Sequence, residues 1–406
     1  MNLLVIGYVW PEPNSSAAGS RMMQLLQCFR QQDWKVTFAS PAQTTEHMSD
    51  LSSLGIHSTS IQLNCTSFDE FIQQLKPDIV IFDRFMMEEQ FAWRVEKHCS
   101  EALRVLNTED LHSLRNARHS ALKQNREFQE DDLHSELAIR EVAAIHRCDL
   151  TLMISEVETQ LLIDKFHVPE SHLLHLPFML PTPQDLEALP SFEDRQHFIS
   201  IGNFRHAPNW DAVLYLKNTL WPMIRQQLPQ AELHIYGAYP PPKATQLHNP
   251  NQGFLIKGWA KNALTVMQEA RICLAPLRFG AGIKGKLVEA MQMGTPSITT
   301  KVGAESMHGP LPWNGVTTDD AQEFCDAAVS LYEDRTSWEL MQYNGTQILS
   351  QRYLASHWQP IFIRRLENQF KLKDALRKRH FWGSMLRHHS LKSSQYMSQW
   401  IELKNK

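Results

Sequence analysis

The sequence lacks any apolar run that approaches the roughly 20 residues needed to cross a membrane. Its first apolar stretch, Leu3–Val9, has neither a preceding basic region nor a small-residue cleavage site, so we expect no secretory signal. The six cysteines are widely separated along the chain: Cys28, Cys65, Cys99, Cys148, Cys273 and Cys325. We therefore expect free thiols and a protein of the reducing cytoplasm.

Spacings typical of metal sites are also missing. No Asp-x-Asp triplet directly follows a predicted strand, and the 19 histidines show no spacing typical of a ligand set. The acidic residues at 130–132 and 319–320 fall where helices are expected to begin or to expose a face, so helix capping explains them better than metal binding. We expect no metal and no cofactor.

Charge of either sign is unevenly distributed. The whole chain has a net charge of −4, but from residue 371 onward nine cations face two acids, a balance of +7 that leaves −11 for the rest. An acidic body argues against nucleic-acid binding, whereas a basic tail suits an anionic surface.

The basic tail also carries large apolar side chains, namely Phe381, Trp382, Met385, Leu386, Met397 and Trp400. Two interpretations stay open for residues 371–406. The segment lies peripherally on the inner face of an anionic membrane, or it forms a helix that packs on the protein and keeps its cations in water.

The rest of the chain has the pattern of a two-domain α/β protein. Short β-rich runs alternate with amphipathic stretches, which is typical of parallel sheets with helices on both faces. Strands are expected near residues 3–6, 36–39, 79–82, 105–106, 150–154, 173–176, 198–201, 233–236, 254–257, 272–275 and 297–299. Helices are expected near residues 21–31, 68–75, 87–99, 119–146, 157–166, 209–227, 263–269, 286–293, 321–332 and 338–350.

Four prolines within residues 177–190 interrupt helix and strand alike and indicate an interdomain linker. The sequence thus predicts a first doubly wound domain over residues 1–185, a second over 186–354, and a C-terminal part over 355–406. The helical stretch at 355–370 is placed to return to the first domain.

The most informative segment runs from Pro276 to Pro296, PLRFGAGIKGKLVEAMQMGTP. Its glycines allow a ligand to approach the backbone closely, and the free amides of a helix that starts near Lys284 favour an anion. Lys284 and Lys286 add full charges, and Glu289 lies three residues after Lys286 on the same helical face. These residue types predict a pyrophosphate site, with the Glu289 carboxylate able to accept hydrogen bonds from vicinal sugar hydroxyls.

This segment resembles the signature of glycosyltransferase family four, the retaining GT-B enzymes also called glycosyl transferases group 1. The similarity is to a bacterial subgroup that reads PLR-x-GAG-x-KGK. Further segments match the same subgroup: IGNFRHAPNWD at 201–211, NTEDLHSLR at 107–115, SEVE at 155–158 and TKVGAE at 300–305. Together the matches extend over most of residues 1–350.

The resemblance implies a GT-B fold, in which two Rossmann-like domains face a cleft, and transfer of a sugar from a nucleoside diphosphate donor with retention of configuration. Arg205, at the carboxyl edge of a predicted strand, corresponds to the arginine that contacts the donor phosphates. The donor-binding candidates are Arg205, Lys284, Lys286, Glu289, Gly282, Ile283, Asn209 and Gly19. Asn209 and Asp211 are equally compatible with the N-terminal cap and first turn of a helix, and Gly19 with an ordinary strand-to-helix turn.

In the first domain, Glu109, Asp110 and His112 follow a predicted strand and point towards the same cleft. The resemblance places a catalytic or sugar-contacting group here, and we favour Asp110 supported by His112 as the group that orients or deprotonates the acceptor hydroxyl. Asp110 is also placed to cap a helix that begins at Leu111. Asp83 and Arg84 are acceptor-side candidates that can equally form a structural ion pair.

One position departs from the family pattern. Many members carry two glutamates of which the first corresponds here to Ala281, so that Glu289 stands alone. The amides of residues 282–284 are able to replace that missing contact. We therefore expect a metal-independent hexosyltransferase-type enzyme acting on a glycan, lipid-linked or other small acceptor. A nucleotide-sugar epimerase of the same fold and an inactive GT-B scaffold are the alternatives.

Overall fold

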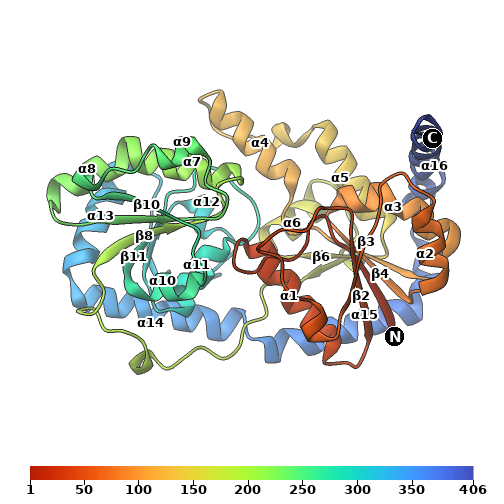
Figure 1. Ribbon diagram of the computed structural model, residues 1–406, viewed down its shortest axis with the longest axis horizontal. Coiled ribbons are helices and arrows are strands. Elements are labelled where there is room, and N and C mark those ends of the chain that lie inside the picture. Colours follow the sequence, from red (N-terminus) through yellow and green to blue (C-terminus); the bar gives the residue numbers. More distant parts are fainter. Residues whose placement is uncertain (406) are drawn as a thin grey trace.

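The computed structural model describes residues 1–405, which form two parallel-sheet domains side by side (Figure 1). The first sheet has seven strands in the order β3-β2-β1-β4-β5-β6-β7, and the second has six in the order β10-β9-β8-β11-β12-β13. The sequence prediction of two Rossmann-like domains with doubly wound parallel sheets is confirmed.

The first sheet forms because its central strands are continuous apolar runs that bury both faces. In β1, Leu3 to Ile6 are fully buried, and alternate residues contribute to the separate apolar clusters on the two sides of the sheet. The strands are β1 (Asn2–Ile6), β2 (Lys35–Ser40), β3 (His57–Ser60), β4 (Ile79–Asp83), β5 (Leu103–Asn107), β6 (Leu150–Met153) and β7 (Leu173–His175). The helices are α1 (Ala17–Arg30), α2 (Ser67–Leu75), α3 (Phe85–His98), α4 (His112–Lys123), α5 (Glu136–Arg147) and α6 (Glu156–Asp164).

The second sheet is built in the same way. Its strands are β8 (His197–Ile201), β9 (Leu233–Tyr236), β10 (Phe254–Gly258), β11 (Ala270–Ala275), β12 (Ser297–Thr299) and β13 (Gly315–Thr317). Its helices are α7 (Ala207–Tyr215), α8 (Trp221–Gln227), α9 (Pro242–Thr245), α10 (Ala263–Glu269), α11 (Gly285–Gln292), α12 (Lys301–Ala304), α13 (Ala321–Glu333) and α14 (Arg335–Arg352). A five-residue π-helical segment, Leu216–Leu220, joins α7 to α8.

The chain passes between the domains twice. The proline-rich linker leads from β7 to β8, and the helix α15 (Ala355–Arg379) returns along the first domain (Figure 1). Phe362 and Leu366 of α15 are fully buried in the cluster that also holds Leu3 and Val5 of β1. A backbone bridge between Leu180 and Leu354 ties the two passages together.

The last helix, α16 (Phe381–Lys404), packs on α3 and α5 of the first domain. Among residues 1–405, none of the helices combines the length and apolar character that crossing a bilayer requires. Lys406, one of the nine cations of the tail, lies outside the described residues.

One sequence prediction of local structure is wrong, and two edge strands were missed. The single helix expected over 119–146 is divided into α4, a short 3-10 helix Glu130–Leu133, and α5. It breaks because Asn125 adopts a left-handed φ of 52° and because Ser135 caps a new helix by accepting the amide of Ala138. The edge strands β3 and β13 were not expected, since β3 is polar and only partly buried and β13 is only three residues long.

Candidate functional site between the two domains

The N-termini of α1 and α11 meet at the domain interface. A side chain on Gly285, the first residue of α11, would collide with Ala17, the first residue of α1. Helix α1 follows β1, and helix α11 follows β11, which lies next to β8 in the second sheet. Both helices therefore begin at the carboxyl edge of their sheet, where open α/β sheets bind ligands. The positive ends of two helices therefore lie next to each other, which creates a local potential that attracts an anion.

Lys286 extends from the first turn of α11 to the glycine that follows β8. Its Nζ atom donates a hydrogen bond of 2.8 Å to Oδ1 of Asn209, and a side chain on Gly202 would meet both of these groups. Removal from water lowers the pKa of Lys286 to about 8, although the Glu289 carboxylate partly opposes this effect. The same removal from water raises the pKa of Glu289 to about 7, against the influence of Lys286. Lys286, Asn209 and Glu289 thus form one polar cluster on the second domain.

Arg205 lies in the loop after β8 that also contains Gly202, but its side chain points away from Lys286 and towards Tyr239. The backbone amide of Arg205 donates to Oδ1 of Asn203. The carbonyl of Asn203 in turn accepts the side-chain amide of Asn209, so the backbone at Arg205 is connected to the Lys286 cluster. The exposed guanidinium of Arg205, however, lies 3.7 Å from the ring centroid of Tyr239. The Tyr239 hydroxyl in turn donates to the carboxylate of Glu12 in the first domain. In this closed arrangement Arg205 covers the rim of the interface, and contact with a phosphate stays a prediction.

Asn209 and Asp211 both lie in α7, and their side chains differ in role. Asn209 contacts Lys286, as described above, whereas Asp211 forms a two-bond ion pair with Arg278 at 2.9 and 2.5 Å. The α7 N-cap residue, His206, makes no side-chain capping bond. The structure therefore gives neither Asn209 nor Asp211 a capping role.

Lys284 lies two residues before Lys286 and is enclosed by charges from both domains. Only 7% of it is exposed, and its Nζ donates to the carbonyl of Gly282 at 2.7 Å. Burial lowers its pKa, while Glu305 and Glu158 oppose that shift. Lys284 is therefore a buried interdomain cation, in contrast to the partly exposed Lys286.

Gly282 contacts the first domain directly. It has a left-handed φ of 64°, and its amide donates a bond of 2.6 Å to Oε1 of Glu158. Burial raises the pKa of Glu158, and the charge of Asp110 raises it further. Because this amide is already occupied, it reaches a phosphate only if the bond to Glu158 breaks. Ile283, the next residue, is buried in the apolar cluster beside Leu287, which leaves its backbone as the part able to contact a ligand.

A further interdomain contact, made by Arg118, was not predicted from the sequence. Arg118 of α4 binds Glu305 through two hydrogen bonds of 2.8 and 2.7 Å and also donates to the carbonyl of Gly280 at 2.9 Å. Glu305 and Glu158 end the segments TKVGAE and SEVE, so the sequence marked these stretches without revealing that they meet. Three separate motifs, those at 155–158, 276–296 and 300–305, thus converge on one interface.

On the first domain, Asp110 is the most strongly ionised of the three catalytic candidates. Burial alone would raise its pKa, but the adjacent Arg115 and His112 hold it at about 2. Nε2 of His112 lies 3.5 Å from Oδ1 of Asp110, and burial lowers the pKa of His112 to about 4, so the imidazole is neutral at pH 7. A side chain on Gly282 would approach Cβ of Asp110 closely, which places the second-domain loop beside this pair.

The alternative role of Asp110, as the cap of a helix, is wrong. Helix α4 begins at His112 after Leu111, and a distant carboxylate, that of Glu141, accepts the amides of His112 and Ser113 at 2.9 and 3.0 Å. Burial raises the pKa of Glu141 to about 7 despite these bonds. A glutamate 29 residues away leaves no local sequence signal for such a cap.

Glu109 and Asp83 belong to a buried network of charged residues that also includes Arg21. Glu109 has a left-handed φ of 64°, accepts a bond of 2.7 Å from Asn107, and lies 4.0 Å from Nε of the buried Arg21. Burial raises the pKa of both Glu109 and Asp83, which also repel each other. Asp83 accepts the side-chain amide of Asn107 at 3.3 Å.

Arg84 and Gly19 complete the first-domain candidates. Arg84 has a left-handed φ of 73° at the start of α3, and its guanidinium lies 5.0 Å from the ring centroid of Tyr8. The amide of Gly19 donates to the capping hydroxyl of Ser16, and a side chain there would collide with the backbone of Glu12. Gly19 thus allows the close packing that positions the N-terminus of α1.

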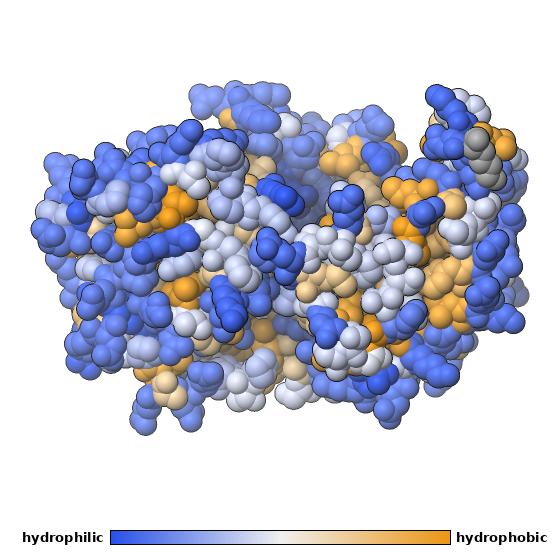
Figure 2. Space-filling model, in the orientation of Figure 1, coloured by the Kyte–Doolittle hydropathy of each residue, from blue (hydrophilic) through white to orange (hydrophobic). Residues whose placement is uncertain are grey.

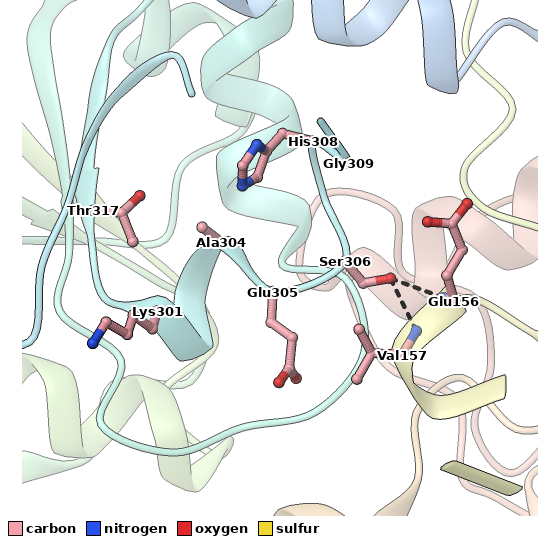
Figure 3. A pocket seen from close by; sticks show the side chains of 9 residues that line it. All are labelled: Glu156, Val157, Lys301, Ala304, Glu305, Ser306, His308, Gly309 and Thr317. Carbon is pink, nitrogen blue, oxygen red and sulfur yellow. Dashed lines mark hydrogen bonds between the residues drawn. The ribbon is translucent and has the colours of Figure 1, made fainter. Parts of the chain in front are cut away.

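A separate cavity of about 320 Å³ lies at the outer edge of the same interface. Lys301, Glu305, His308 and Thr317 contribute to its lining (Figure 3). At its border the Ser306 hydroxyl accepts the amides that begin α6 in the first domain, at 2.8 and 3.4 Å (Figure 3). None of the predicted site residues lines this cavity. Figure 2 shows a further recess between the domains near the top of the view.

Known proteins share both this fold and part of the sequence pattern. Residues 195–334, most of the second domain, match the family model described as Glycosyl transferases group 1. No curated protein matches the chain.

Among solved structures, HepE of Anabaena, in complex with UDP and glucose, has a TM-score of 0.69 at 12% identity over 90% of this chain and 99% of HepE. Sucrose-phosphate synthase of Thermosynechococcus elongatus has a TM-score of 0.67 at 14% identity over 91% of this chain and its own full length. TarM of S. aureus, in a complex that contains UDP, has a TM-score of 0.57 at 11% identity, and the match covers 74% of this chain but only 58% of TarM. These likenesses establish the GT-B fold.

Proposed function

We propose that the protein is a retaining glycosyltransferase that moves a hexosyl group from a nucleoside diphosphate sugar to a glycan, a lipid-linked or another small acceptor. The observation that carries this proposal is the convergence of the α1 and α11 N-termini at the domain interface, with Lys286 of the polar cluster in the first turn of α11. A diphosphate is the part of such a donor that two helix N-termini and an ammonium group recognise. The match of residues 195–334 to a glycosyltransferase family model supports the same conclusion.

On the donor side, Lys286 neutralises the charge that develops on the leaving diphosphate as the sugar–oxygen bond breaks. Glu289 accepts hydrogen bonds from vicinal hydroxyls of the nucleoside, which its position three residues beyond Lys286 allows. Arg205 reaches the phosphates once it leaves Tyr239. Fixed cations and helix amides supply the stabilisation, so we propose a metal-independent reaction.

On the acceptor side, Asp110 remains ionised and orients the acceptor hydroxyl, while the neutral His112 beside it is able to accept a proton. The raised pKa of Glu109 favours its protonated form, which suits a hydrogen-bond donor better than a base. Closure of the domains through Arg118 and Glu158 excludes water, which would otherwise compete as acceptor. The free cysteines support a cytoplasmic location.

Calorimetry with a panel of nucleoside diphosphates, followed by product analysis with the corresponding sugar donors, tests this proposal. We expect one diphosphate to bind and its sugar to be transferred to an added acceptor or slowly to water. Binding of no member of the panel would contradict the proposal. Isomerisation of the donor in the absence of any acceptor would assign the site to an epimerase instead.

A further inference from the structure

We infer that the outward face of α16 docks on an anionic lipid surface. Six large apolar side chains of this helix are more than half exposed: Phe381, Trp382, Tyr396, Met397, Trp400 and Leu403. Trp382, Tyr396 and Leu403 are separated by multiples of seven residues and therefore lie on one side of the helix. An exposed cluster of this size and composition on a terminal helix marks an interaction surface.

The opposite face of α16 is unusually small and polar for a face that contacts the protein. Gly383 approaches the carbonyl of His146 so closely that any side chain would collide with it, and Ser398 accepts a bond of 3.3 Å from Arg94. Leu391 is the large apolar residue of α16 that is buried in the core. The inward face of α16 is therefore held by contacts with the first domain, whereas most of its large apolar side chains face outward and are available to a partner outside the chain.

The charged residues around this apolar face indicate an anionic partner. Lys392 and Lys404 lie on the exposed side of α16, and Lys378 and Arg379 at the end of α15 are exposed next to it. The single acid of α16, Glu402, accepts bonds from the amide and hydroxyl of Thr66 at 3.3 and 2.9 Å, at the start of α2. The docking face thus combines cations with aromatic rings and carries no carboxylate of its own.

This combination fits a bilayer better than a protein. Tryptophan and tyrosine favour the interfacial region of a membrane, and lysines beside them contact anionic headgroups. A second copy of the same face would bring like charges together, which opposes self-association. A 24-residue helix measures about 36 Å, long enough to lie in the plane of the interface with one face inserted.

The position of α16 suits this role. It lies at the end of the first domain that is remote from the second domain (Figure 1), so docking there leaves movement between the domains free. This surface, formed by α16 and the adjacent end of α15, is independent of the candidate site, so docking holds whether or not the protein transfers sugars.

Sedimentation of the full-length protein with vesicles tests the inference. We expect binding to vesicles of phosphatidylcholine mixed with phosphatidylglycerol, weaker binding to phosphatidylcholine alone, and release as salt is added. The double variant Trp382→Ser, Trp400→Ser should lower the partition coefficient about tenfold, because each ring supplies inserted surface. The charge-reversal variant Lys392→Glu, Lys404→Glu should lower binding to the anionic vesicles by at least as much.

The matched control is Leu340→Ser, Tyr343→Ser on α14 of the second domain, where both side chains are also more than half exposed. It should bind vesicles like the wild type, and all variants should keep their melting temperature. Three results would overturn the inference: no binding of the wild type to anionic vesicles, equal losses in the control, or a wild-type dimer that the tryptophan variant converts to a monomer.

Discussion

Lys284 and Lys286 are two residues apart in one loop, yet they occupy opposite kinds of environment. Lys284 is buried among Glu158, Glu305 and Arg118 and joins the two domains, whereas Lys286 reaches across the second domain to Asn209 and stays partly exposed. The difference arises at the start of α11. Lys284 is the N-cap residue with extended backbone, and Lys286 is already in the first helical turn, so their side chains leave on different sides.

The glycine-rich loop at 276–286 therefore has two parts with different contacts. Its first part, from Gly280 to Lys284, is a latch that holds the domains together. Its second part, the first turn of α11 with Lys286, belongs to the proposed anion site. A sequence pattern with two lysines does not distinguish these tasks, because the distinction depends on which residues of the other domain come near.

The largest effect expected is that of Lys286→Ala. Loss of a positioned cation from a site where charge develops should lower kcat/KM about 10²- to 10³-fold, or about 3–4 kcal/mol of transition-state stabilisation. Affinity for the nucleoside diphosphate should fall as well. Calorimetry and initial-rate kinetics measure the two quantities separately.

Lys284→Ala sharpens this comparison as the matched variant. It should lower the melting temperature, since it removes the buried cation that lies between Glu158 and Glu305, but it should retain most of the diphosphate affinity. If Lys284→Ala lost diphosphate affinity as strongly as Lys286→Ala at an unchanged melting temperature, the division of the loop into latch and anion site would be wrong.

A second way to test the latch is Arg118→Ala, which removes the two bonds to Glu305 and the bond to the Gly280 carbonyl. We expect kcat/KM to fall about tenfold, or about 1.4 kcal/mol, because the closed state becomes less populated. Small-angle scattering should show a larger radius of gyration for the variant.

Arg335→Ala serves as the control for Arg118→Ala, because Arg335 also makes two bonds to carboxylate oxygens, those of Glu193 and Glu339, but on the exposed surface of the second domain. It should leave turnover and shape unchanged. A variant at position 118 that kept both the wild-type rate and the wild-type scattering curve would show that closure does not depend on this contact.

Much of the fold followed from the sequence because apolar runs such as Leu3–Ile6 and turn signals such as Gly294 act locally. Gly294 adopts a left-handed φ of 60° just after α11, as its position before Thr295-Pro296 predicts. The same local logic correctly identified the caps: Asp320, within the acidic pair at 319–320, accepts the amide of Glu323 at the start of α13.

What the sequence could not reveal depends on contacts between distant segments. The carboxylate of Glu141 caps α4 from another helix, and Glu158 occupies the amide of Gly282 from another domain. Both residues look like ordinary surface glutamates in amphipathic helices. The orientation of Arg205 was equally hidden, since it is set by Tyr239, a residue beyond the next strand.

The latch should also respond to pH through Glu158. Its folded-state pKa is raised by burial, so its contribution to stability is fully present below the unfolded pKa of about 4.5 and is lost as pH rises through the folded value. Glu158→Gln imitates the protonated form and still accepts the Gly282 amide. The variant should gain stability over the wild type as the pH rises from about 5 to about 9, by about 1 kcal/mol at the alkaline end.

Asp164→Asn is the control on the same helix, since Asp164 is exposed and the hydrogen bond that it accepts comes from Gln160 of that helix. Its difference in melting temperature from the wild type should be nearly independent of pH over the same range. A Glu158→Gln difference that shrank or stayed constant towards alkaline pH would contradict a buried, raised pKa at the latch.

The smallest effect expected comes from Ser306→Ala at the edge of the interface. Its hydroxyl accepts the amides of Glu156 and Val157 at the first turn of α6, where Ser155 already caps the amide of Glu158 (Figure 3). Because the local cap remains, loss of the second acceptor should cost only about 0.5–1 kcal/mol of the free energy of unfolding. Chemical denaturation measures this, with Ser191→Ala in the exposed linker as the control. A cost above about 2 kcal/mol would mean that this contact, rather than Arg118 and Glu158, dominates the latch.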